Sequence, residues 1–223
     1  MTNSFRRLLA GLTLFITEFA LALGVGVLGV VAFLAIGREV FNEHAAPFDE
    51  AAFRWTRDLF GPTRQQWVEV LTFFASRNFI VAAALGLIGY FLLVRRHRWY
   101  SLLVPVVALG SITLNLLLKN FYHRPRPLLP LVSASGLSFP SGHAMIGLAL
   151  YGCLAWLLWR HRRHPTGAAL LLLLALLIGL TRVYLHVHYA TDVLAGFAAG
   201  LLWLILLRTV LRLWWRESDE VMR

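Results

Sequence analysis

The chain is poor in two residue types whose scarcity narrows its chemistry. It has a single cysteine, Cys153, inside an apolar run, so no disulfide can form within the chain. A buried free cysteine usually packs as a small hydrophobic residue, and we assign it no role. Lysine is equally scarce, because Lys119 is the one lysine among 21 basic residues. A position that keeps an ammonium group in such an arginine-rich chain is expected to need one chemically.

Charged residues are also scarce. They make up 14% of the sequence and hydrophobic residues 59%, which excludes an ordinary soluble domain. Of the 11 carboxylates only Asp192 lies in the polar patches described below, so the sequence offers no acidic cluster for Mg²⁺, and we expect neither a metal nor a cofactor. The net charge of +10 suits arginines facing anionic lipid headgroups and requires no nucleic-acid partner.

Long apolar runs fill most of the chain. A bilayer core of about 30 Å needs roughly 20 helical residues, so runs of about 18 or more predict membrane helices. The first run is longer than the core of a signal peptide, about 7–15 residues, and we expect it to be retained. The sequence thus predicts an all-α bundle of six transmembrane helices, at Leu8–Gly37, Leu71–Val94, Trp99–Leu118, Ala144–Trp159, Gly167–Leu185 and Val193–Leu207.

Arginine placement predicts the orientation of this bundle. With the N-terminus inside, dense arginine clusters fall on the cytoplasmic side, as the positive-inside tendency requires. We therefore expect both termini in the cytoplasm of a bacterial cell and the long segment 38–77 on the outer face of its inner membrane. The clusters contain Arg6, Arg7, Arg95, Arg96, Arg98, Arg160, Arg162, Arg163, Arg208, Arg212, Arg216 and Arg223.

Segment 38–77 contains an amphipathic pattern. Apolar residues recur at helical spacing after Pro47, which predicts a helix that ends near Gly61. It fits equally a helix on the membrane surface and a lid packed on the bundle. No linker or repeat divides the chain, so residues 1–223 are expected to form one domain. The apolar positions are Phe48, Ala52, Trp55 and Leu59, opposite Glu50, Arg54, Arg57 and Asp58.

Three polar patches interrupt the apolar sequence, at Lys119–Pro127, Pro140–His143 and Thr181–Asp192. In the expected topology all three emerge on the outer face. One further polar residue, Glu18, lies deep in a span, where acids are costly. We expect it to make a structural contact with Thr13 and Thr17 rather than to take part in chemistry.

The patches contain the parts of a phosphate-transfer site. His188 and Asp192 are four residues apart and share a helix face if the last span begins there. An Asp that binds one imidazole nitrogen fixes the tautomer and leaves the other nitrogen free as a base or nucleophile. Ser141, Gly142 and His143 open the fourth span, where backbone N–H groups can cradle an anion.

Three cations, Lys119, Arg126 and Arg182, complete this set at the ends of the third and fifth spans. They would bind phosphate oxygens, while one histidine attacks phosphorus and the other protonates the leaving oxygen. Each residue alone also fits a structural role, such as a snorkelling arginine or an interface histidine. Their shared placement at one membrane face favours a single site.

The pattern resembles the three-part signature of the type 2 phosphatidic acid phosphatase (lipid phosphate phosphatase) superfamily. The matching motifs are Lys119-x6-Arg126-Pro127, Pro140-Ser141-Gly142-His143 and Arg182-x5-His188-x3-Asp192. The resemblance implies that His188 forms a phosphohistidine, that Asp192 orients it and that His143 is the general acid. It also implies that Lys119, Arg126, Ser141, Gly142 and Arg182 bind the phosphate, and that no metal is needed.

Two positions depart from the family pattern. Thr181 stands where the family often has Ser, and His186 stands where it often has Gly. Neither change removes a catalytic group, and we expect His186 to be an interface residue rather than one that tunes substrate choice.

The resemblance leaves several functions open. Vanadium-dependent haloperoxidases share the signature, but they resemble soluble proteins, and six spans argue against that reading. A lipid-to-lipid phosphotransferase, acting for example on lipid A, would use the same first half-reaction, and a non-enzymatic lipid-binding relative should have lost a catalytic residue. The expected partners are membrane lipids and a lipid phosphate substrate. On the resemblance alone, undecaprenyl diphosphate ranks first, before phosphatidylglycerophosphate, phosphatidate and a lipid A phosphate.

Overall fold

The computed structural model describes residues 2–61, 65–94, 98–162 and 164–215. All regular secondary structure in these ranges is helical, which confirms the predicted all-α class. The elements are α1 (Thr2–Phe41), α2 (Ala46–Phe60), α3 (Gln65–Phe73), α4 (Arg77–Gly89), a π-helical turn η1 (Tyr90–Val94), α5 (Arg98–Tyr122), α6 (Gly142–Arg162), α7 (Pro165–Tyr184) and α8 (Ala190–Trp215).

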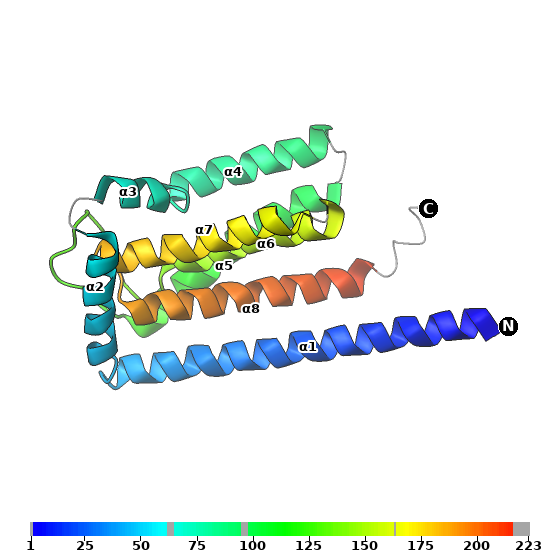
Figure 1. Ribbon diagram of the computed structural model, residues 1–223, viewed down its shortest axis with the longest axis horizontal. Helices are drawn as coiled ribbons and strands as arrows, with labels where there is room; N and C mark the ends of the chain where they lie inside the picture. Colours follow the sequence, from blue (N-terminus) through cyan, green and yellow to red (C-terminus); the bar gives the residue numbers. More distant parts are fainter. Residues whose placement is uncertain (1, 62–64, 95–97, 163, 216–223) are drawn as a thin grey trace.

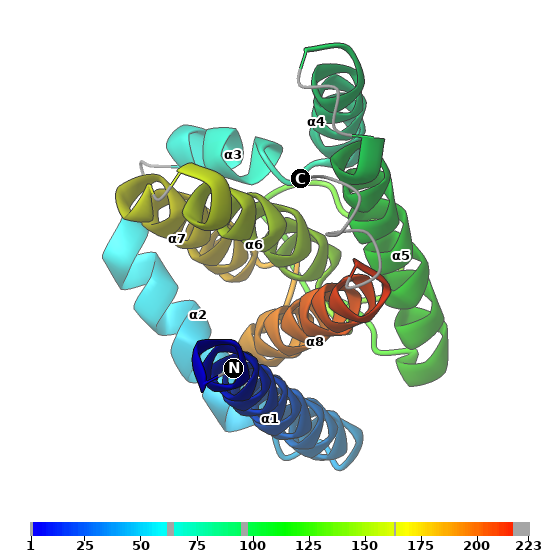
Figure 2. The same cartoon turned by 90° about the vertical axis from the view of Figure 1, so that its right-hand side faces the viewer.

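The long helices run side by side along the molecule, whereas α2 lies across one end of the bundle (Figure 1). Helix α6 packs against α5, α7 and α8, and α1 lies outside α8 (Figure 2). The first residues of α1 and the last residues of α8 lie at the same end, opposite α2 (Figure 1). At the end of the bundle next to α2, helix termini and loops therefore lie close together.

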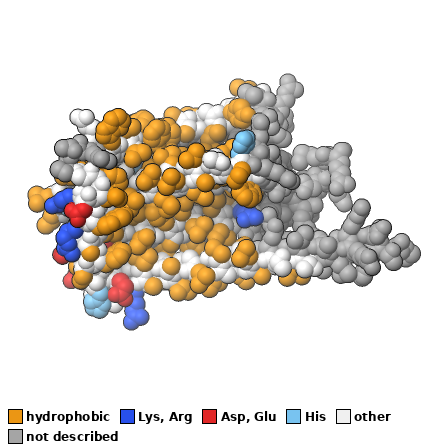
Figure 3. Space-filling model, in the orientation of Figure 1, with side chains coloured by type: hydrophobic (Ala, Val, Ile, Leu, Met, Phe, Trp, Pro, Cys, Tyr) orange, Lys and Arg blue, Asp and Glu red, His pale blue; other side chains and the backbone are white. Residues whose placement is uncertain are grey.

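Five helical stretches among the described residues are long and apolar enough to cross a membrane. They are Phe19–Phe41, Gln65–Gly89, Gly142–Trp159, Pro165–Tyr184 and Ala190–Val210. The sixth expected span, 99–118, coincides with α5, which is not among these five, so the count of six stays a prediction. Hydrophobic side chains cover the middle of the surface and charged ones gather at the α2 end (Figure 3). The protein is therefore a multi-pass membrane protein.

The second span is not one continuous helix. The sequence predicted an uninterrupted run from Leu71, but α3 ends at Phe73 and α4 begins at Arg77. Ser76 causes the break because its hydroxyl caps α4, accepting a hydrogen bond from the Phe79 N–H at 3.3 Å. A capping serine gives the chain an alternative to a continuous helix, and apolarity alone cannot reveal it.

Two glycines allow α8 to approach the start of α6. A Cβ on Gly196 would lie 2.7 Å from the Ser141 carbonyl oxygen, and one on Gly200 would lie 2.6 Å from that of Met145. Both distances are shorter than real Cβ contacts, so only glycine permits this packing of backbone on backbone. The beginning of α6 is thereby fixed against the first turns of α8.

The amphipathic helix predicted after Pro47 is α2, which ends at Gly61 as expected. Its apolar residues Phe48, Trp55 and Leu59 remain more than half exposed, as suits a helix at the membrane surface. The charged residues opposite them are exposed as well, and a third face, with Asp49 and Thr56 buried, packs on α7 and α8. Helix α2 thus combines the two roles that the sequence left open, a surface helix and a cover for the bundle.

Some expectations fall on residues or side chains outside the described part. Thr17 donates to the Thr13 carbonyl at 3.0 Å, but the Glu18 side chain is not among those described, so its expected contact stays a prediction. The same holds for eleven of the twelve arginines that predict the orientation, because all but Arg208 lie outside the described residues or have side chains that are not described.

Candidate active site

The three polar patches meet at the end of the bundle that carries α2. They comprise the last turn of α5, the loop before α6, and the connection between α7 and α8. Backbone hydrogen bonds join these segments: Ser138 N–H donates to Arg124, Ser141 N–H to Asp192 and Leu131 N–H to Leu185, at 2.8–3.0 Å. These hydrogen bonds fix the loop at three points, although it has no regular structure.

His188 lies at the bottom of this arrangement and is only 2% exposed. Its Nδ1 is 3.5 Å from Asp192 Oδ2, so the predicted pairing occurs. The premise behind it was wrong, because α8 begins at Ala190 and His188 precedes the helix. Asp192, in the first turn of α8, instead contacts residues that precede the helix. Its Oδ2 also accepts a hydrogen bond from the Tyr189 N–H at 2.9 Å, and this N–H is one of the donors that a helix start leaves unpaired.

Ser138 completes the contacts of the imidazole. Its hydroxyl lies 3.3 Å from His188 Nδ1 and donates a short hydrogen bond to Asp192 Oδ2. This residue, which was not predicted from the sequence, stands two positions before Pro140 and is fully buried. Its hydroxyl contacts both the His188 ring and the Asp192 carboxylate, and it therefore connects both side chains to the loop before α6.

Arg126 determines which nitrogen of His188 carries the proton. Its Nη1 donates to the Val187 carbonyl at 2.6 Å and lies 3.2 Å from His188 Nε2. A guanidinium can only donate, so Nε2 acts as the acceptor and the proton resides on Nδ1. Burial lowers the pKa of His188 to about 4, against the opposing effects of Asp192. The imidazole is therefore neutral near pH 7, and the lone pair on Nε2 faces Arg126 Nη1.

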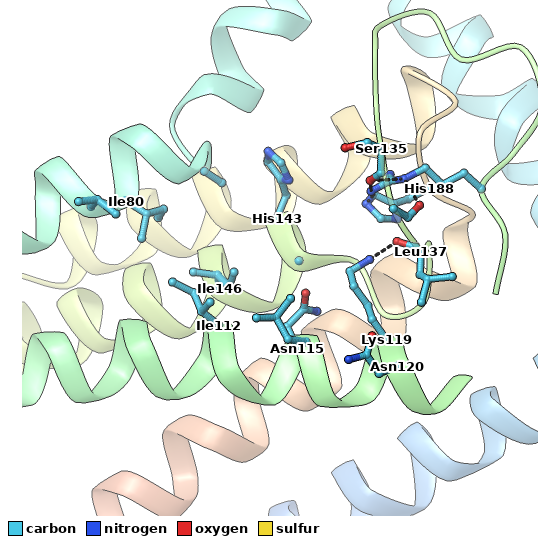
Figure 4. A pocket seen from close by; sticks show the side chains of 16 residues that line it. Ile80, Ile112, Asn115, Lys119, Asn120, Ser135, Leu137, His143, Ile146 and His188 are labelled. Atoms are coloured by element: carbon cyan, nitrogen blue, oxygen red, sulfur yellow. Dashed lines mark hydrogen bonds between the residues drawn. The ribbon is translucent and has the colours of Figure 1, made fainter. Parts of the chain in front are cut away.

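Lys119 contacts the same loop from the last turn of α5. Its Nζ donates to the backbone carbonyl of Leu137 (Figure 4) and to that of Ser138, the second at 3.1 Å. An ammonium has three protons, so one remains for a ligand. Lys119 thus holds the segment that presents Ser138 and also lines the cavity described below.

Two predicted phosphate ligands have buried donors without partners in the described part of the chain, the Ser141 hydroxyl and Arg182 Nε. Arg182 uses its Nη1 on the Thr72 hydroxyl of α3 at 2.8 Å. Gly142 is the first residue of α6, so its surroundings include the free N–H groups of a helix start. Unsatisfied buried donors are rare in native proteins and commonly mark a place for a ligand or water.

A cavity of about 620 Å³ is lined by Gly142 and by other predicted site residues, but not by Ser141, Arg182 or Asp192. Its polar end contains Lys119, Arg126, His143 and His188, and the rest is lined largely by apolar side chains of α4, α5 and α6. In Figure 4, His143 lies between His188 and the isoleucines Ile80, Ile112 and Ile146. Lys119, Arg126 and Arg182 are all close enough for their positive charges to interact with the His143 ring. The cavity therefore joins a cationic end to an apolar slot.

The two departures from the family pattern lie away from the cavity. The Thr181 hydroxyl donates to the Ile178 carbonyl of its own helix at 2.6 Å. His186 adopts a positive φ of 53°, a conformation that favours glycine, and its ring stacks on Phe53 of α2 at 4.3 Å. Burial lowers the pKa of His186, and the nearby Arg57 charge lowers it further. Its contacts join the α7–α8 connection to α2.

Besides Ser138, the structure adds three residues to the site that could not be selected from the sequence pattern. Asn115 donates to the Pro140 carbonyl at 3.2 Å and supports the turn that enters α6. Arg124 donates to Asp192 Oδ1 at 2.7 Å and to Asp49 Oδ2 at 2.8 Å. Asp49 brings a second carboxylate close to the patches, although the sequence placed only Asp192 there.

Comparison with known proteins gives consistent results. The model of the PAP2 superfamily matches residues 99–216. Phosphatidylglycerophosphatase B of Bacillus subtilis is 36% identical over 155 residues, which cover 65% of this chain and 76% of that protein. The crystal structure of a transmembrane PAP2 type phosphatidylglycerolphosphate phosphatase from B. subtilis superposes with a TM-score of 0.76 at 30% identity, covering 83% of this chain and 94% of that chain. The crystal structure of Aquifex aeolicus LpxE shares the fold, with a TM-score of 0.58 at 22% identity over 70% of this chain and 92% of that chain.

Proposed function

The chain belongs to the PAP2 superfamily, and from this premise we propose that it dephosphorylates a membrane lipid through a phosphohistidine on His188. The predicted enzyme class, a hydrolase of lipid phosphates, is confirmed at the level of the family. What supports the specific proposal is the cavity, in which a cationic end with two histidines continues into an apolar slot. Such a shape suits a phosphate attached to a hydrocarbon anchor.

The first half-reaction begins with the lone pair on His188 Nε2. This nitrogen attacks phosphorus, an N–P bond forms, and the P–O bond to the lipid breaks. His143 gives its proton to the leaving oxygen, so the lipid departs as a neutral alcohol or as a shortened phosphate. As positive charge develops on the imidazole, the Nδ1 proton faces Asp192 and Ser138, which stabilise it.

The second half-reaction restores the enzyme. Water attacks the phosphohistidine, the N–P bond breaks, and inorganic phosphate leaves with the oxygen of water. His143, now lacking its proton, can accept one from that water. The cations Lys119, Arg126 and Arg182 stabilise charge on the phosphoryl oxygens in both steps, so the chain's own residues supply electrostatic stabilisation without a metal.

The substrate we propose is phosphatidylglycerophosphate. The similarity to phosphatidylglycerophosphatase B extends over most of that protein, and it moves this lipid ahead of undecaprenyl diphosphate, which the sequence analysis ranked first. Phosphatidate and undecaprenyl diphosphate remain the competitors. All three present a phosphate at the end of an apolar anchor.

A lipid panel tests both the reaction and the substrate. Purified full-length protein in mixed micelles should release inorganic phosphate from phosphatidylglycerophosphate in excess EDTA, and more slowly from the two competitors. Loss of turnover in EDTA, restored by Mg²⁺, would contradict the metal-free mechanism. A faster rate on another lipid would correct the substrate alone.

We also propose that the site faces the periplasm and that both termini are cytoplasmic. The shared location of the first residues of α1 and the last residues of α8, opposite the site, supports an even number of crossings. Reporter fusions after Arg98 and after Arg163 should give cytoplasmic signals, and a fusion near Ala134 a periplasmic one. The reverse pattern would place the site on the inner face.

A further inference from the structure

Asp49 is 1% exposed although it belongs to a surface helix whose neighbouring Glu50 side chain is 70% exposed. A carboxylate buried to this extent needs partners for its charge. It accepts the Thr191 N–H at 2.9 Å and the Thr191 hydroxyl at 2.9–3.0 Å, which caps the first turn of α8. Arg124 supplies the countercharge. Asp49 thus connects α2 to the helix that carries Asp192.

Arg124 holds two carboxylates with its two terminal nitrogens. Nη1 donates to Asp192 Oδ1 and to the Thr191 hydroxyl, both at 2.7 Å, while Nη2 donates to Asp49 Oδ2 at 2.8 Å. The guanidinium also lies over the Tyr189 ring, 3.9 Å from its centroid. Stacking and paired hydrogen bonds together leave the planar group little freedom to rotate.

This bridge decides how Asp192 presents itself to the nucleophile. Arg124 occupies Oδ1, so Oδ2 is the oxygen left for His188, Ser138 and the Tyr189 N–H. Without Arg124 the carboxylate could turn, and two buried anions would share the region without their common cation. The imidazole would then lose its fixed tautomer and direction.

We propose that Arg124 and Asp49 are positioning residues for the nucleophile, and that α2 contributes to the active site through Asp49. This inference rests on the proposed function, since it assigns a role relative to attack by His188. It predicts an effect on the chemical step rather than on phosphate binding, because neither side chain lines the cavity.

Kinetics of full-length variants on the lipid phosphate test this role. We expect Arg124→Gln to lower kcat by about 100-fold and Asp49→Asn by about tenfold, within the range for residues that support a reactive group. KM and the inhibition constant of inorganic phosphate should stay within about twofold, since the phosphate ligands are intact. Arg124→Lys should recover part of kcat. Glu50→Gln, which removes an exposed carboxylate from the same helix, should match the wild type.

A double variant guards against loss of folding. Asp49→Asn/Arg124→Gln removes both charges together, so it leaves neither of these two unpaired, and thermal melting shows whether it folds. We expect a folded protein with kcat still at least about tenfold below the wild type. Wild-type kcat in this variant, or a rise in KM with kcat unchanged, would overturn the inference. An active His188→Ala would instead overturn the proposed function.

Discussion

The two histidines of the site have contrasting surroundings. The ring of His188 is held on both nitrogens, by Ser138 and Asp192 on one side and Arg126 on the other. His143 stands at the start of α6, where the hydroxyl of Ser141 has no partner in the described structure. The proposed nucleophile is therefore held by its neighbours, whereas the start of α6 keeps an unpaired donor that suits a phosphate ligand. Preorganisation on one side and unused donors on the other is what electrostatic catalysis requires.

The comparison fails outright if His188 is not the nucleophile. His188→Ala should lower kcat by about 10⁴-fold or more on every substrate, because no other group at the site replaces its lone pair. Rapid quenching with ³²P-labelled substrate should trap no phosphoenzyme. Thermal melting close to that of the wild type serves as the control, and a trapped acid-labile phosphate in this variant would mean that another residue is attacked.

Replacing His143 should cost less, and the cost should depend on the leaving group. His143→Ala is expected to lower kcat by about 10²–10³-fold on a lipid phosphate, within the range of general acid catalysis. On an activated aryl phosphate the loss should be below about tenfold, since that leaving oxygen needs little protonation.

The same variant should still accumulate phosphate on His188. The wild-type rate on the aryl phosphate shows whether this small substrate enters the cavity. An equal loss on both substrates without a trapped intermediate would assign His143 to phosphate binding.

Replacing Lys119 tests the loop before α6, which carries Ser138 beside His188 and Ser141 beside His143. Lys119→Arg should lower kcat/KM at least about tenfold, equivalent to about 1.4 kcal/mol, because a wider planar group replaces an ammonium placed against the carbonyls of Leu137 and Ser138. The reverse exchange at an exposed site, Arg54→Lys, is the matched control. Unchanged kinetics in Lys119→Arg would reduce Lys119 to a positional charge.

The smallest expected effect is in the pH profile. The pKa of His188, lowered to about 4 by burial, keeps the imidazole neutral as the pH falls, so the acidic limb of kcat/KM should lie well below 6.5. Between pH 7 and pH 5.5 the neutral fraction should barely change, whereas an ordinary histidine with a pKa of about 6.5 would lose about tenfold. Rates must be corrected for ionisation of the substrate phosphate. A limb near 6.5 would mean that water reaches His188 in the free enzyme.

Much of this architecture could be predicted from the residues. Apolar runs predicted the membrane helices, and Pro47 and Gly61 marked both ends of α2, because these signals are local. The signature residues also gather as expected, since helix ends at one membrane face must meet. Their catalytic roles stay predictions.

The supporting residues could not be predicted, because their partners are distant in the sequence. Asp49 contacts a residue 142 positions away, and nothing in its local pattern distinguishes it from the exposed Glu50. In the sequence Ser138 looks like any loop serine, and only the fold shows that its hydroxyl lies 3.3 Å from His188 Nδ1. The clue in the sequence was that Ser138 lies two residues before Pro140, which begins the second polar patch.

The glycine contacts between α6 and α8 bear on how the enzyme responds to its bilayer. Gly196 and Gly200 place α8 directly on the backbone of Ser141 and Met145, so close backbone contact sets the spacing between Asp192 and the turn that we propose binds phosphate. Helix α4, by contrast, packs mainly on α5 and forms one wall of the apolar slot. Changes in lipid chain length act on helix tilt through hydrophobic mismatch and should move α4 before they disturb α5, α6 and α8. In vesicles of short or long acyl chains, KM should therefore vary with membrane thickness while kcat stays nearly constant.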